Sequence, residues 1–126
     1  LVSAPTVQTE VAGTDATLQN GPMKATYTPY YKDDQLQRIV ERRTLGDTTA
    51  EGEYEFTGAR LVKYRGAPLE ESGELTIELD ITGAVLNARK DDAPASDADV
   101  RAILNRASLL RNHALARQAS STHPTY

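Results

Sequence analysis

Few residues of this chain have the types and spacing that catalysis requires. Histidine, the usual acid and base near neutral pH, occurs only as His113 and His123. Neither has a second histidine at metal-binding spacing, and no serine lies in a Gly-x-Ser-x-Gly turn. Cysteine is absent, which excludes thiolate nucleophiles, disulfides and cysteine-bound zinc. We therefore predict a protein without catalytic residues, metal or cofactor.

The acidic residues form two clusters whose order does not match a metal site. A calcium loop requires alternating acids, a central glycine and a terminal bidentate glutamate, and the segment 91–96 has no such order. Solvated loops and a helix start explain these acids. The clusters are Glu70, Glu71 and Glu74, and Asp91, Asp92, Asp97 and Asp99.

Basic residues gather on the segments that follow three predicted turns, at about Asp33, Gly58 and Gly83. Adjacent strands could stack them into a basic ridge that binds an anion or an acidic partner. Alternatively, they form cross-strand ion pairs with acids of the incoming strands. The sequence leaves both interpretations open for Arg38, Arg42, Arg43, Lys63, Arg65, Arg89 and Lys90.

Tyrosine dominates the aromatic residues, with six copies against one phenylalanine and no tryptophan. Three tyrosines crowd one segment beside Pro29. Tyrosine is enriched in interfaces because it joins an apolar ring to a polar hydroxyl, although it is also a good strand former. The predicted binding residues are Tyr27, Tyr30, Tyr31, Arg38, Arg42, Lys63, Arg65 and Lys90.

An internal repeat predicts the elements that position these side chains. Leu36, Leu61 and Leu86 recur at a spacing of 25 residues. A fixed period of this kind marks a repeated structural unit. Each leucine follows a large apolar residue by five positions and a turn former by three; these pairs are Tyr31 and Asp33, Phe56 and Gly58, and Ile81 and Gly83.

Each unit is expected to form a β-hairpin. Leu75, Ile77, Leu79 and Ile81 alternate with polar residues, as in a strand with one buried face. Pro29 favours an edge position for its own strand. Over about residues 30–90, the units resemble the Tyr-x-x-x-Gly-x-Leu hairpin repeats of MORN-variant and similar bacterial proteins. That resemblance implies hairpins and carries no catalytic residue.

A single amphipathic helix follows the hairpins. Ser96 is a suitable N-cap, with Asp99 three residues later. Apolar residues then recur at helical spacing, which predicts a helix over about 97–118. Together these elements predict an α+β fold, in which an antiparallel meander of about six strands is covered on one face by the helix. Dimerisation through the helix stripe is the alternative. The stripe is Val100, Ile103, Leu104, Ala107, Leu110 and Ala114.

Bulk composition is typical of one folded domain. The chain has 126 residues, 39% apolar and 25% charged, with a net charge of −4 that argues against nucleic-acid binding. No apolar run reaches the roughly 18 residues of a membrane span. We predict a small, polar N-terminal tether over 1–22, a domain over 23–119 and a tail over 120–126.

The tether is typical of exported proteins after removal of a leader, with a lipid anchor possible upstream of Leu1. We expect a periplasmic or lipoprotein-type module of the bacterial envelope that binds a protein or envelope component through its sheet face or hairpin tips. It would be a monomer or a weak dimer. The alternatives are a cytoplasmic location, and a small-ligand carrier or minor enzyme with a pocket between sheet and helix. Tyr64, Arg111 and His113 are the candidates for that pocket.

Overall fold

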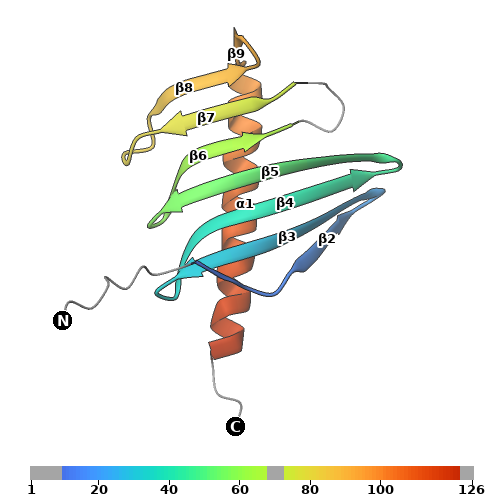
Figure 1. Cartoon of the computed structure of the whole chain (residues 1–126), viewed down its shortest axis with the longest axis vertical. Helices are drawn as coiled ribbons and strands as arrows, with labels where there is room; N and C mark the ends of the chain where they lie inside the picture. The colour runs from blue at the N-terminus through green and yellow to red at the C-terminus, as the bar shows by residue number, and fades with distance from the viewer. Residues whose placement is uncertain (1–9, 68–72, 123–126) are drawn as a thin grey trace, which may run out of the picture.

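The fold is an antiparallel β-meander with one C-terminal helix packed on it, as predicted. The computed structural model describes residues 10–67 and 73–122, and Figure 1 shows the helix α1 crossing behind the strands. Within these residues the sheet has nine strands, more than the six or so predicted. They are β1 Val11–Ala12, β2 Ala16–Asn20, β3 Met23–Lys32, β4 Gln35–Leu45, β5 Thr48–Thr57, β6 Arg60–Gly66, β7 Leu75–Leu79, β8 Val85–Lys90 and β9 Ala93–Pro94.

The three predicted hairpins are present as β3–β4, β5–β6 and β7–β8. The first turns at Asp33 and Asp34, which both have positive φ, and the second turns at Gly58, with a φ of 59°. Aspartate tolerates this left-handed region and glycine adopts it freely. The three tips lie along one side of the sheet (Figure 1).

The third hairpin departs from the predicted repeat. Leu36 and Leu61 are buried, but Leu86 is 67% exposed and Ile81, predicted to face the core, is 73% exposed. Strand pairing explains the difference. Tyr31 pairs with Leu36 and Phe56 with Leu61, whereas the matching pair in the third hairpin is Leu79 with Val85.

The reason is the length of the third turn. The first two hairpins turn over two residues, because Lys32 pairs with Gln35 and Thr57 with Arg60. The third uses the five residues 80–84, so Ile81 lies in the turn and not in the strand. Each hairpin has a register shift beside its matching pair, so the length of the turn is what distinguishes the third. The sequence period of 25 therefore aligns structurally equivalent residues in the first two hairpins but not in the third.

Two strands lie within the stretch predicted as a tether. Both β1 and β2 pair with β3, and the chain between them approaches β3 where Gly13 N–H donates to the carbonyl of Pro29 at 2.7 Å. Pro29 has no N–H to offer an adjacent strand, and it lies at the break between β1 and β2. A tether over residues 1–9, and the lipid anchor, fall outside the described residues.

The helix α1 spans Asp97–Thr122 and is longer than predicted. The Ser96 hydroxyl accepts a hydrogen bond from Asp99 N–H at 3.1 Å, which confirms the predicted N-cap. The helix continues through residues 120–122 of the predicted tail, and 123–126 lie outside the described residues. Although α1 has enough residues for a membrane span, its many polar side chains disqualify it, and the described residues offer no other candidate.

The core lies between the inner face of the sheet and the helix stripe. Ile103, Ala107, Leu110 and Ala114 of the stripe are buried, as predicted. They pack with a sheet cluster that contains Tyr27, Tyr54 and Tyr64. Tyrosine therefore supplies much of the buried volume of this chain, which is rich in tyrosine and has one phenylalanine.

Two glycines make room for one of these rings. Gly52 and Gly66 are opposite one another on β5 and β6, and both are buried. A Cβ on Gly52 would lie 2.9 Å from the Tyr64 hydroxyl oxygen, and one on Gly66 would overlap that oxygen. The phenol of Tyr64 therefore fits only because both positions lack a side chain.

Candidate binding site at the third hairpin tip

The three tyrosines of the first hairpin do not share a surface. Tyr27 is fully buried, and its hydroxyl shares a 2.5 Å hydrogen bond with Nδ1 of His113. Tyr30 lies on the opposite, helix-free face under the Arg38 guanidinium, 4.1 Å from the ring centre. Tyr31 is half-buried on the helix side, where burial raises the pKa of its hydroxyl. Strand alternation thus separates residues that are neighbours in the sequence.

Most of the predicted basic residues lie on the helix-free face, where acidic residues are beside Arg38, Arg42, Lys63 and Arg65. Arg38 pairs with Glu53 at 3.3 Å and with Glu10 at 3.4 Å. Further ion pairs on this face are Arg42–Glu51 at 3.5 Å and Arg65–Glu74 at 3.1 Å. Such exposed pairs contribute about 0.2–1 kcal/mol each.

Charge on this face alternates from strand to strand. Lys63 of β6 is exposed between Glu55 of β5 and Glu78 of β7, which are its register partners. Lys90 lies on the opposite face, the helix side of the sheet. Its register partner Leu75 faces the core, and paired residues share a face. On the helix-free face, the basic residues of β4 and β6 therefore alternate with acidic ones instead of forming an uninterrupted basic ridge.

A buried ion pair joins the sheet to the helix. Glu41 of β4 is 0% exposed, and its Oε2 accepts hydrogen bonds from Nε and Nη2 of Arg106 at 2.8 and 2.5 Å. The Tyr54 hydroxyl donates to Oε1 at 2.9 Å, and Arg43 Nε lies 3.7 Å from the same oxygen. Burial raises the pKa of Tyr54 well above its usual value, with Glu41 adding to the effect, so Tyr54 stays a donor. A buried carboxylate with this many donors has a structural role.

Sequence reasoning missed this pair, although a local signal was present. Glu41 occupies an inward position of β4, two residues after the buried Ile39. A carboxylate at such a position requires a buried cationic partner. Arg106 lies between Ile103 and Ala107 of the helix stripe, and this placement could have identified it as that partner.

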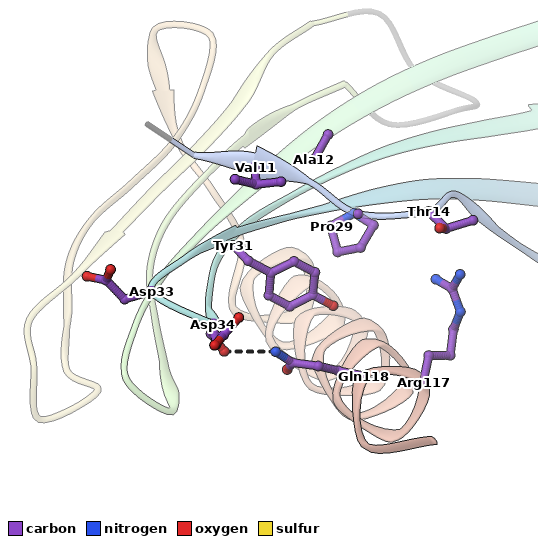
Figure 2. Close-up of a pocket in the computed structure, with 10 residues that line it drawn as sticks. Val11, Ala12, Thr14, Pro29, Tyr31, Asp33, Asp34, Arg117 and Gln118 are labelled. Atoms are coloured by element: carbon purple, nitrogen blue, oxygen red, sulfur yellow. Dashed lines mark hydrogen bonds between the residues drawn. The ribbon is translucent and has the colours of Figure 1, made fainter. Parts of the chain in front are cut away.

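A cleft lies between the first hairpin and the C-terminal half of α1. It has a volume of about 440 Å³, and Pro29, Tyr31, Arg117 and Gln118 are among its lining residues. Figure 2 shows the Tyr31 ring reaching toward the helix, where the Gln118 amide donates to the carbonyl of Asp34 at 2.8 Å.

The residues predicted for a ligand pocket do not meet in this cleft. Tyr64 fills the space above Gly52 and Gly66, and His113 is bonded to Tyr27. Arg111 lines a separate, smaller hollow beside Leu36 and Gly58. Among the described residues, no group of three histidine or acidic side chains could hold a metal ion.

The tip of the third hairpin exposes three large aliphatic side chains within six residues. Ile81 is 73%, Val85 45% and Leu86 67% exposed. Isolated exposed apolar residues are normal on a protein surface, so it is the closeness of these three in the chain, around one turn, that makes the tip a candidate interaction site. We call this surface the tip patch.

Hydrogen bonds centred on Asp80 hold the tip in one conformation. Its Oδ1 accepts from Thr82 N–H at 2.8 Å, from the Thr82 hydroxyl at 2.5 Å and from Ala84 N–H at 3.0 Å. Hydrogen bonds from the Thr82 hydroxyl, and then from the backbone N–H groups, lower the pKa of Asp80 from its ordinary value. Arg60 of the second tip donates to the Thr82 carbonyl at 3.0 Å, which ties the two tips together. The tip patch is therefore presented on a braced turn.

Comparison with known proteins gives no significant match to a family model, a curated protein or a solved structure.

Proposed function

We propose that the chain is a non-enzymatic binding module that holds a protein partner at the tip patch. The observation that carries the proposal is the exposure of Ile81 on a turn braced by Asp80, together with that of Val85 and Leu86 at the start of β8. Binding to an ordered loop costs less conformational entropy than binding to a flexible one. The aliphatic side chains contribute most binding free energy if the partner offers an apolar groove that removes them from water.

A binding role agrees with the hydrogen bonding of the acid–base groups inside the fold. The two most plausible acid–base groups of the interior, His113 and Glu41, are held by Tyr27 and Arg106 respectively. Their partners occupy them in structural contacts, whereas the tip patch has no such role in the core. The location of the module in the bacterial envelope stays a prediction from the sequence.

A small-ligand carrier is the second candidate, because the cleft beside Tyr31 falls in the size range of ligand sites, about 300–1,000 Å³. It ranks below the protein-binding role because its lining mixes the apolar Pro29 and Tyr31 with charged groups and leaves the cleft open to solvent. In such a site, a small apolar ligand would stay partly hydrated.

The proposal is tested by comparing partner capture by the full chain and by Ile81→Ser/Leu86→Ser. Both side chains are largely exposed, so the variant should keep its melting temperature. We expect it to retain less than a tenth of a partner that the unmodified chain captures from bacterial envelope or cytosolic extracts. Leu109→Ser is the matched control, because Leu109 is an exposed aliphatic residue on α1. Equal capture by the tip variant and the control would exclude the tip patch.

A further inference from the structure

The two edges of the sheet are built differently. β9 is two residues long, contains Pro94 and follows Asp91 and Asp92, all features that discourage further strand pairing. β2 is five residues long, Ala16–Asn20, and has no charged residue or proline. Among the described residues, β2 pairs only with β3. Its outer side therefore offers backbone groups to another strand.

Strand geometry identifies these backbone groups. The Pro29 carbonyl accepts from Gly13, so the main-chain groups of Pro29 face away from β4. Backbone direction alternates along a strand, hence Tyr27 faces the same way, toward its partner Ala16. Ala16 and Leu18 then point back to β3. The N–H and C=O of Thr17 and Gln19 point outward from the sheet.

This outward pattern is complementary to itself. If two copies of β2 pair antiparallel about Leu18, Thr17 of each copy lies opposite Gln19 of the other. Each such pair exchanges two N–H···O=C bonds, which gives four bonds across a two-fold axis. Asp15 then lies opposite Gly21, so no like charges meet.

The side chains agree with this register. The two Leu18 residues form the non-hydrogen-bonded pair, in which side chains approach most closely. Leu18 is partly buried and already packs against the core on the helix side. We propose that the chain self-associates through β2, with Leu18 at the two-fold axis and one continuous sheet across both copies.

Cysteine crosslinking provides a direct test, because the chain has no cysteine of its own. In a non-hydrogen-bonded antiparallel pair, the Cα atoms are about 4.5 Å apart, within disulfide range. Leu18→Cys should therefore form a disulfide-linked dimer under mild oxidation at least ten times faster than Leu109→Cys, because Leu109 is an exposed side chain on α1, away from β2. Equal rates for the two variants would overturn the proposal.

A second variant disrupts the pairing between two copies of β2, and its test needs no crosslink. Gln19→Pro deletes an outward N–H and leaves the bonds to β3 in place. We expect the dimer dissociation constant from sedimentation equilibrium to rise at least ten-fold. Ala93→Pro, on the opposite edge, should leave that constant unchanged. A chain that stays monomeric at millimolar concentration, or a dimer that tolerates Gln19→Pro, would each refute association through β2.

Discussion

Replacing Arg106 with methionine should strongly destabilise the fold. Methionine keeps most of the apolar length of the side chain but removes both hydrogen bonds to Glu41. The carboxylate is 0% exposed and would keep one bond, from Tyr54, with Arg43 Nε 3.7 Å away. Breaking a buried ion pair by removing one partner costs about 3–5 kcal/mol. For a domain of this size, that corresponds to a melting temperature lower by roughly 10–20 °C.

The measurement is urea unfolding followed by circular dichroism, with Arg101→Met as a control for the chemical change. Arg101 is exposed on α1, so its replacement should change the free energy of unfolding by less than about 0.5 kcal/mol. In the double variant Arg106→Met/Glu41→Gln, stability should partly recover, because the buried group is then uncharged. If Arg106→Met costs no more than Arg101→Met, the ion pair does not hold the helix to the sheet.

Two further predictions concern backbone space and pH. Gly66→Ala should destabilise the fold by about 1–3 kcal/mol in thermal unfolding, because the new Cβ overlaps the Tyr64 hydroxyl. An unchanged melting temperature would show that Tyr64 can move aside. Since the hydrogen bonds at the tip lower the folded-state pKa of Asp80 from its unfolded value, its contribution to the tip is complete above the unfolded-state pKa and lost as the pH falls through the folded-state pKa. The amide resonances of Thr82 and Ala84 should therefore shift with an NMR midpoint below that of an aspartate in the unfolded chain, and a midpoint at or above that of the unfolded chain would contradict the bracing role.

Local patterns predicted most of the fold. Alternation in 75–79 identified a half-buried strand, and Ser96 with the apolar stripe identified the helix. Both signals arise within one element, where side-chain period and capping act directly. The repeat of 25 residues found all three hairpins, because each turn follows its incoming strand at nearly the same spacing.

The candidate site was not predictable from the same patterns. Ile81 continues the alternation of β7 in sequence, and only the five-residue turn removes it from the strand. The length of that turn depends on the bonds that Asp80 makes with Thr82 and Ala84. The Glu41–Arg106 pair is different, because the inward position of Glu41 and the place of Arg106 in the helix stripe were signals in the sequence, although the two residues are 65 positions apart.

The position of α1 in the chain has a consequence for protein synthesis. All nine strands precede α1, and the apolar inner face of the sheet has no other cover among the described elements. During translation, the nascent hairpins therefore expose Tyr54, Phe56 and Ile77 to the cytosol until the ribosome has delivered the helix. Transiently exposed apolar surface of this kind promotes aggregation and chaperone binding. A stop codon placed before Ser96 should therefore give an insoluble product, although every strand would be intact.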